Sequence, residues 1–235
     1  MDKSKCAIIS GVSGQDGAYL SNLLIGKGYT VVGLTRSYSK STIVKLNKLH
    51  LENKIIIEEC DLLDYSSILR IVTKYKPNEI YNLASQSSVG ISFQQPIGTL
   101  QFNILSVLNF LEIIREFVPT VRFYQASSSE MFGNIRNLPI TEDEVFNPQS
   151  PYAISKASAH WLVKLYRESY GIYACSGILF NHESILRDDH FFIKKLISNA
   201  VKIKRNKNEK LILGNINIKR DFGYSPDYVK AMYLM

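Results

Sequence analysis

Short runs rich in β-branched residues alternate with longer segments of helical period along the first 180 residues. The runs CAIIS, TVVGL, KIIIEE and EIYNLAS alternate with segments such as GAYLSNLLIGKG and TLQFNILSVLNFLEIIREF. Continuous apolar strands separated by amphipathic helices are typical of parallel sheets that helices cover on both faces. The alternation therefore predicts an α/β fold with a doubly wound parallel sheet.

Beyond Phe180 this regularity weakens. We expect a polar loop, a helix near residues 189–204, a strand at LILG (211–214) and a helix over Tyr228 to Met235. We assign residues 1–180 to one domain and residues 181–235 to part of a smaller lobe, interleaved with the last strands of the sheet. Because the sequence stops inside a helical pattern, we expect this second lobe to be truncated.

Composition restricts the classes of partner. Of the 235 residues, 46% are apolar, which is typical of a globular protein. Much of the net charge of +7 lies in residues 194–210, which we interpret as a basic helix face and a solvated loop. No nucleic-acid recognition motif accompanies it. The longest apolar run, FNILSVLNFLEII, is interrupted by polar groups, so we expect no membrane span.

The three cysteines are Cys6, Cys60 and Cys175, an odd number spread over distant apolar segments. This spacing forms neither a disulfide framework nor a set of metal ligands. We therefore expect reduced, buried thiols in a cytoplasmic protein without a metal site.

The segment GVSGQDG joins the first predicted strand to the first predicted helix. Gly11 permits a tight turn, Gly14 lets the backbone approach a pyrophosphate, and Gly17 lets helix and strand pack closely. Free N–H groups at the helix N-terminus suit a phosphate. The position of the motif predicts a dinucleotide site, and its other members are Val12, Ser13, Gln15 and Asp16.

The ends of the next strands predict the rest of that site, because this architecture binds ligands at carboxyl ends of strands. Arg36, with Lys40 nearby, follows the second strand, where an acid would favour NAD. A guanidinium suits a 2′-phosphate instead, which favours NADP over NAD. Asp61 could accept a bond from the adenine amino group. The further expected cofactor residues are Leu62, Leu83, Ala84, Ser85, Gln86 and Ser87.

The segments ASSSE and SPYAISK carry the predicted chemistry. Tyr152 and Lys156 are four residues apart and share one face of a helix. The ammonium is expected to lower the pKa of the phenol, while Ser128 and Tyr152 reach a substrate carbonyl or hydroxyl. Such a set is that of a short-chain dehydrogenase/reductase. Glu130 adds a base at the neighbouring carbon, which indicates dehydration instead of simple redox chemistry.

Six segments of the chain resemble the GDP-mannose 4,6-dehydratase family of extended short-chain dehydrogenase/reductases: GVSGQDGAYL, EIYNLASQSSV, RFYQASSSEMFG, SPYAISK, YRESYGIYACSGILFNHES and LILGNINIKRDFGYSPDYVK. The resemblance runs from about residue 5 to the final residue, and the fifth segment is more specific than the glycine turn. It implies a Rossmann domain with a smaller substrate lobe and tightly held NADP. It further implies GDP-mannose or a related GDP-sugar as substrate, and a homo-oligomer, either a dimer or a tetramer.

The resemblance also implies residue roles. Tyr152 would take the proton of the C4 hydroxyl while hydride passes to NADP⁺, and Glu130 would then remove the C5 proton. Water would leave from C6, to which the hydride returns. Lys156 would support the tyrosine and bind the cofactor. The further residues implied are His182 and Arg187 for NADP, and Ser87, Ser128, Glu130, Asn181 and Arg220 for the sugar nucleotide.

The chain departs from the family pattern at several positions. Ser128 stands where threonine is usual, and its hydroxyl can play the same part. Other departures are Ser37 for a second arginine, Gly98 for a tyrosine, and Ile185 with Leu186 in place of a proline and an arginine.

The sequence supports three hypotheses about function. The first is a 4,6-dehydratase for GDP-mannose or another GDP-sugar such as a heptose. The second is a GDP-4-keto-6-deoxy-sugar reductase or an epimerase, of which the reductase would consume NADPH stoichiometrically. The third is a truncated, inactive chain that binds NADP.

Overall fold

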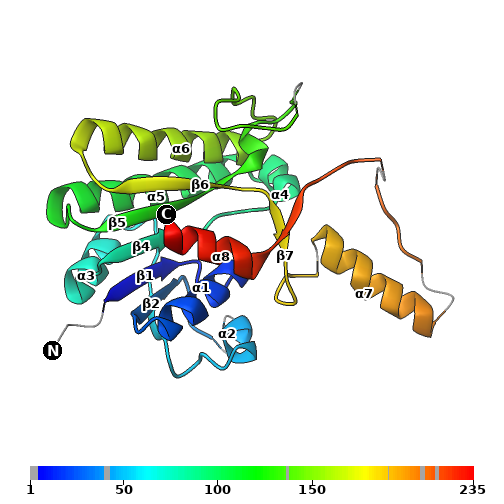
Figure 1. The fold of residues 1–235 in the computed structure, drawn as a ribbon, viewed down its shortest axis with the longest axis horizontal. Coiled ribbons are helices and arrows are strands. Elements are labelled where there is room, and N and C mark those ends of the chain that lie inside the picture. Colours follow the sequence, from blue (N-terminus) through cyan, green and yellow to red (C-terminus); the bar gives the residue numbers. More distant parts are fainter. Residues whose placement is uncertain (1–4, 40–42, 136–137, 190, 207–209, 215–216) are drawn as a thin grey trace.

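The computed structural model describes residues 5–39, 43–135, 138–189, 191–206, 210–214 and 217–235. Six parallel strands form its main sheet in the order β3-β2-β1-β4-β5-β6, which confirms the predicted doubly wound sheet (Figure 1). The order reverses between β1 and β4, so a crevice is expected at their carboxyl ends. The strands are β1 (Cys6–Ser10), β2 (Thr30–Thr35), β3 (Ile56–Glu59), β4 (Glu79–Asn82), β5 (Arg122–Ser128) and β6 (Ala174–Leu179).

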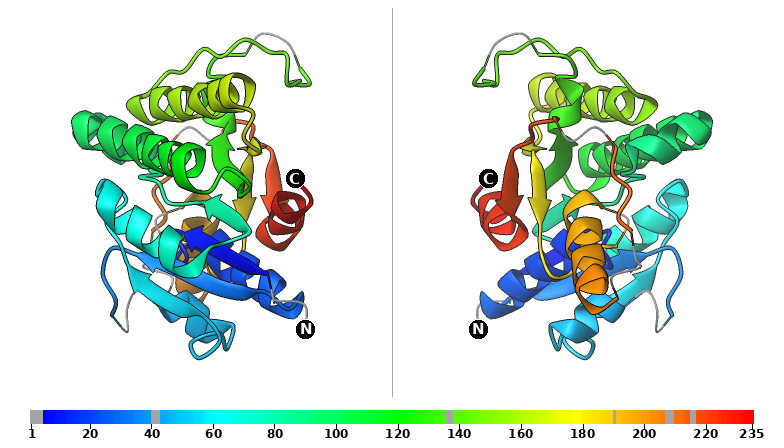
Figure 2. Two further views of the ribbon diagram at one scale, coloured as in Figure 1. Left: turned by 90° about the vertical axis from the view of Figure 1, so that its left-hand side faces the viewer. Right: turned by 90° about the vertical axis from the view of Figure 1, so that its right-hand side faces the viewer.

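Helices cover both faces of this sheet (Figure 2). Alternate residues of β1 serve the two faces: Ile8 packs with the α3, α5 and α6 layer, whereas Ala7 and Ile9 pack with the α1 and α8 layer. Burial on both faces explains why the strands are continuously apolar. The helices are α1 (Gln15–Gly26), α2 (Val44–Lys48), α3 (Tyr65–Tyr75), α4 (Val89–Gln94), α5 (Pro96–Phe117), α6 (Pro151–Tyr170), α7 (Phe192–Arg205) and α8 (Ser225–Leu234), with a 3-10 turn at Ser129–Met131.

Helix α5 corrects one prediction from composition. By length and composition alone it is long and apolar enough to cross a membrane, so the argument from polar interruptions was wrong for this helix. A core helix passes the same test, and 44% of its most apolar window is buried. Its buried residues, among them Phe110 and Ile114, pack in the layer that covers one face of the sheet. That packing accounts for the apolar character of α5.

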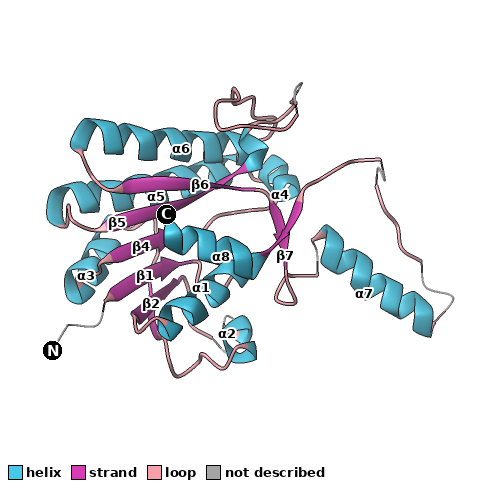
Figure 3. Cartoon of the chain, viewed as in Figure 1, coloured by secondary structure: helices cyan, strands magenta, loops and turns pink. Residues whose placement is uncertain are grey.

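The C-terminal segment contains two helices of opposite character. Helix α8 packs on α1 and buries Ser225, Val229 and Met232. Helix α7 confirms the helix expected near 189–204, but none of its described residues is buried, and it stands apart from the sheet (Figure 3). The strand predicted at 211–214 does not form. Two short parallel strands, β7 (Asn181–Glu183) and β8 (Phe222–Tyr224), form instead. The domain boundary at residue 180 stays a prediction.

The three cysteines are free thiols. Cys60 is buried as predicted, whereas Cys6 and Cys175 are half-buried, so the prediction of buried thiols was wrong for these two. Burial raises the pKa of each thiol, which favours the neutral form.

Candidate active site

A cleft of about 1350 Å³ opens at the carboxyl ends of the strands. It lies where the strand order reverses, as expected for ligand sites of open α/β sheets. The cleft brings together most of the residues predicted from sequence. Those that line it are Gly11, Ser13, Gly14, Gln15, Asp16, Gly17, Arg36, Leu62, Leu83, Ala84, Ser85, Gln86, Ser87, Ser128, Glu130, Tyr152, Lys156, Asn181, His182 and Arg187.

Three predicted residues do not line the cleft. Val12 is buried below the glycine turn, where its methyl groups fill the space above Gly33. The Asp61 carboxylate accepts a hydrogen bond from the Leu63 N–H at 3.0 Å, within its own turn. Arg220 is exposed on the segment before β8 and donates to the carbonyl of the preceding residue. Lys40, expected beside Arg36, lies outside the described residues.

The glycine turn has the close backbone contacts that the motif predicts. Gly11 has φ +70°, a conformation that favours glycine. A Cβ atom on Gly17 would lie 2.4 Å from the Gly11 carbonyl oxygen, so only glycine fits where helix and strand meet. Helix α1 begins at this turn without a side-chain cap from Gly14. Its first N–H groups therefore suit an anion.

Ser128, Glu130, Tyr152 and Lys156 form one side of the cleft, which we call the β5–α6 wall. Ser128 is the last residue of β5, and its hydroxyl accepts a hydrogen bond from the Glu130 N–H at 3.2 Å. The Ser150 hydroxyl caps α6, which begins at the following proline. Tyr152 and Lys156 thus lie in the first two turns of a helix whose N-terminus is stabilised by a serine cap and a proline, beside the end of β5.

Burial governs the electrostatics of the β5–α6 wall. Burial raises the pKa of Tyr152; the Ser128 hydroxyl and the Arg187 guanidinium oppose this effect, and the Glu130 carboxylate adds to it. Burial also lowers the pKa of Lys156 to about 8. The prediction that Lys156 lowers the pKa of Tyr152 was therefore wrong for the chain itself. The physical reason is burial, the largest cause of the raised pKa of Tyr152. The Lys156 ammonium itself donates to the Ala126 carbonyl oxygen at 2.8 Å.

A buried polar network behind this wall was missed by the sequence reasoning. The Ser10 hydroxyl donates to the Asn82 side chain, and Asn82 donates to Gln125 Oε1 at 2.8 Å. Gln125 Nε2 in turn donates to the Ala126 carbonyl oxygen, the oxygen that also accepts from Lys156. The network joins β1, β4 and β5 and fixes where the lysine points. Its signal in the sequence was a polar residue inside three predicted strands: Ser10 and Asn82 end β1 and β4, and Gln125 lies in the middle of β5.

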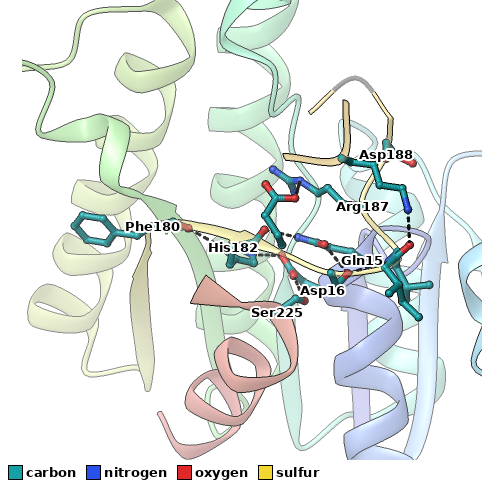
Figure 4. Close-up of polar contacts among 12 residues, drawn as sticks. Gln15, Asp16, Phe180, His182, Arg187, Asp188 and Ser225 are labelled. Atoms are coloured by element: carbon teal, nitrogen blue, oxygen red, sulfur yellow. Dashed lines mark hydrogen bonds and ion pairs between the residues drawn. The ribbon is translucent and has the colours of Figure 1, made fainter. Parts of the chain in front are cut away.

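Residues 181–188 form the opposite side of the cleft, which we call the 181–188 wall, and polar side chains tie it to α1 (Figure 4). Gln15 Nε2 donates to the His182 carbonyl oxygen at 3.0 Å. The Ser184 hydroxyl donates to Gln15 Oε1 at 2.8 Å. His182 Nε2 lies 2.8 Å from an Asp16 carboxylate oxygen. The glycine turn and a segment more than 160 residues away thus form one unit.

Several buried polar atoms at the cleft fit a dinucleotide. Within the described residues, Ser85 Oγ and Gln86 Oε1 are buried without a hydrogen-bond partner, and both residues line the cleft. Arg187 Nε likewise lacks a hydrogen bond, although it lies 3.5 Å from a Glu183 carboxylate oxygen. Buried polar groups of this kind are usually satisfied, so they suit hydroxyl, amide or phosphate groups of a ligand. Together with the glycine turn they form a chemically suitable cradle.

Comparison with known sequences identifies relatives along the whole chain. The sequence model of a family described as GDP-mannose 4,6 dehydratase matches residues 8–235. GDP-mannose 4,6 dehydratase 2 of Arabidopsis thaliana is 43% identical over 245 residues, which cover 100% of this chain and 65% of that protein. GDP-mannose 4,6-dehydratase of Sinorhizobium fredii is 42% identical, with 100% and 69% covered. The chain thus spans about two thirds of the length of these relatives.

Solved structures share the fold. UDP-N-acetylglucosamine 4-epimerase from Methanobrevibacter ruminantium, in complex with UDP-N-acetylmuramic acid, superposes with a TM-score of 0.85 and 28% identity. The match covers 99% of this chain and 73% of that one. dTDP-glucose 4,6-dehydratase from Bacillus anthracis, in complex with NAD, has a TM-score of 0.85 at 17% identity over 98% and 71% of the two chains. At that identity the second likeness shows the fold alone.

Proposed function

The chain belongs to the GDP-mannose 4,6-dehydratase family, and from that premise we propose that it binds NADP and converts GDP-mannose to GDP-4-keto-6-deoxymannose with loss of water. The observation that carries the proposal is the β5–α6 wall. It places a hydroxyl, a carboxylate and a buried phenol in the same cleft as the glycine turn. A dehydration that starts with oxidation at a neighbouring carbon needs these groups side by side.

The lining of the cleft indicates which residues would hold the cofactor. The N-terminal turn of α1 suits the pyrophosphate, and Ser85 with Gln86 offers unpaired polar atoms along the dinucleotide. Arg36 lines the cleft after the end of β2, where a guanidinium favours the 2′-phosphate of NADP. When bound, the oxidised dinucleotide would accept hydride from C4 of the sugar and return it to C6.

The side chains of the β5–α6 wall would move the protons. Tyr152 takes the proton of the C4 hydroxyl, and the Ser128 hydroxyl hydrogen-bonds the oxygen as it becomes a ketone. The ketone acidifies the C5 hydrogen, which Glu130 removes as the C6 hydroxyl departs. Two protons leave the sugar, one departs with the hydroxyl as water, and one returns to C5, so no net proton is consumed. Each acid–base step of this kind contributes roughly 10²–10⁴ in rate.

Mass spectrometry of GDP-mannose incubated with the chain and substoichiometric NADP⁺ tests the proposal. We expect a sugar nucleotide lighter by one water, formed in many turnovers per cofactor. Tyr152→Phe, which removes only the phenolic oxygen, should abolish the product. Unchanged GDP-mannose with the unmodified chain would contradict the proposal, and stoichiometric consumption of NADPH with a keto sugar would indicate a reductase.

Several expectations from the sequence stay predictions: a homo-oligomer, a cytoplasmic location, and the lack of membrane and nucleic-acid partners. They bear on where the proposed reaction takes place and leave its chemistry unchanged.

A further inference from the structure

We infer that His182 is a cation which compensates the Asp16 carboxylate in the first turn of α1, and that this compensation allows the turn to bind a dinucleotide pyrophosphate. The inference rests on the proposed dinucleotide site and deepens it. It assigns Asp16 a positioning and charge-balancing role in place of a cofactor contact.

The hydrogen bonds of His182 require a proton on both ring nitrogens. Nδ1 lies 2.7 Å from the Phe180 carbonyl oxygen, and Nε2 lies 2.8 Å from an Asp16 carboxylate oxygen. A carbonyl and a carboxylate can only accept, so both nitrogens must donate, and an imidazole that donates twice is cationic. His182 is only 7% exposed, which makes an unpaired charge at this position costly.

The hydrogen bonds of Asp16 occupy both of its carboxylate oxygens. One oxygen accepts from His182, and the other accepts from the Ser225 hydroxyl at 2.6 Å (Figure 4). Ser225 begins α8 and is fully buried. Both carboxylate oxygens therefore accept hydrogen bonds from protein side chains. Through these two bonds Asp16 links α1 to β7 and to α8.

The position of Asp16 explains why compensation matters. Asp16 is the acidic residue of the first turn of α1, directly after the glycine turn. The positive potential at a helix N-terminus attracts anions. A carboxylate in the first turn occupies part of that potential and also repels a phosphate bound there. An adjacent imidazolium cancels that repulsion, since a charge pair at 2.8 Å has little net field at the distance of a ligand.

Other charged and titratable groups face His182. The Tyr228 ring of α8 stacks on the imidazole ring, with 4.3 Å between the ring centroids. Glu183 lies next to it on β7, and Arg187 opposes the cation. Burial also works against the cation and lowers the pKa of His182, but the Asp16 bond and charge and the Phe180 carbonyl outweigh burial and raise it. The net effect is a raised pKa of His182, which favours the cation.

Two substitutions separate charge compensation from direct contact. His182→Gln removes the cation and leaves the carboxylate, whereas the double variant Asp16→Asn with His182→Gln leaves a neutral pair. NADPH fluorescence titration at about pH 7 should show about tenfold weaker binding for H182Q, the effect of one uncompensated charge. The double variant should bind within about threefold of the unmodified chain because neither charge remains.

Changing the pH offers a second comparison. The affinity of the unmodified chain for NADPH should fall as the pH rises through the pKa of His182. The double variant should not show this part of the pH dependence. Titration of the 2′-phosphate is common to both proteins, so it cancels in the difference. Long-range ¹H–¹⁵N spectra of the unmodified chain should show both His182 ring nitrogens protonated at about pH 7.

Two results would overturn the inference about His182, and a third would refute the proposed function. A double variant as weak as H182Q would overturn the inference, since His182 would then act by contact or as a structural clasp. A neutral His182 tautomer in the spectra would also overturn it, even if H182Q does not fold. Failure of the unmodified chain to bind NADPH would instead refute the proposed function.

Discussion

The β5–α6 wall of the cleft is held by regular secondary structure, whereas the 181–188 wall is held by side chains from helices distant in sequence. Ser128 ends a central strand, and Tyr152 and Lys156 lie in the first two turns of a capped helix. His182 depends instead on Asp16 and Phe180 for both ring nitrogens. Local structure therefore places the residues of the β5–α6 wall, although the direction of Lys156 also depends on a network across three strands, while the 181–188 wall depends on side chains from distant segments.

The β5–α6 wall should give the largest functional effect. Glu130→Gln should lower product formation by roughly 10²–10⁴ because it removes the base for the C5 proton. NADPH affinity should stay unchanged, since the proposed cofactor residues are intact. The measurements are product mass spectrometry and fluorescence titration. Glu142→Gln, on an exposed turn outside the cleft, is the matched control and should retain full turnover. Full turnover by E130Q would remove Glu130 from the mechanism.

The glycine turn is tied to the 181–188 wall, and crowding the turn should disturb both the packing of α1 and the dinucleotide site. A Cβ on Gly17 would lie 2.4 Å from the Gly11 carbonyl oxygen and 2.7 Å from the Val12 Cα atom. Gly17→Ala should therefore reduce the free energy of unfolding by about 1–3 kcal/mol and weaken NADPH binding. Gly26→Ala in the same helix meets no atom within 4 Å and should change stability by less than about 1 kcal/mol, in the favourable direction. Equal denaturation midpoints for the two variants would contradict the close packing.

The buried ammonium of Lys156 should lower the stability of the fold while serving the proposed active site. Lys156→Met should increase the free energy of unfolding by about 1–3 kcal/mol near neutral pH, because burial disfavours the ammonium. The Ala126 carbonyl stays satisfied by Gln125. NADPH binding should weaken, since the predicted contact of Lys156 with the cofactor is lost. Lys164→Met on the exposed part of α6 should change stability by less than about 0.5 kcal/mol. A K156M variant less stable than the unmodified chain would show that the ammonium contributes more than its burial costs.

The pH dependence of stability should have opposite signs on the two walls. The pKa of His182 is raised, so its contribution is complete below the ordinary value of 6.5 and is lost as pH rises through the raised pKa. The pKa of Lys156 is lowered from 10.5 to about 8, so the unfolded chain holds the proton more tightly and stability increases with pH between those values.

Denaturant unfolding at a series of pH values would separate the two contributions. Asp16→Asn should remove only the component from His182, and K156M only the component from Lys156. Identical pH profiles for all three proteins would show that neither group is linked to folding.

Prediction from sequence succeeded where a contact is local. The strand–turn–helix of GVSGQDG and the spacing of Tyr152 and Lys156 follow from short-range geometry, and the structure places them as expected. It failed where a side chain chooses among distant partners. Lys156 points to the Ala126 carbonyl, and Arg220 lies on an exposed segment away from the cleft. Neither choice is visible in the spacing of residues along the chain.

The sequence by itself determined the class of fold, the glycine turn and the placement of the residues on the β5–α6 wall. Periodicity and turn chemistry act over a few residues, and the sheet then aligns the strand ends. Only the tertiary structure decided the charge state of His182, the role of Asp16 and the pKa values of Tyr152 and Lys156. Burial and long-range hydrogen bonds set those properties, and both exist only after distant segments have packed together.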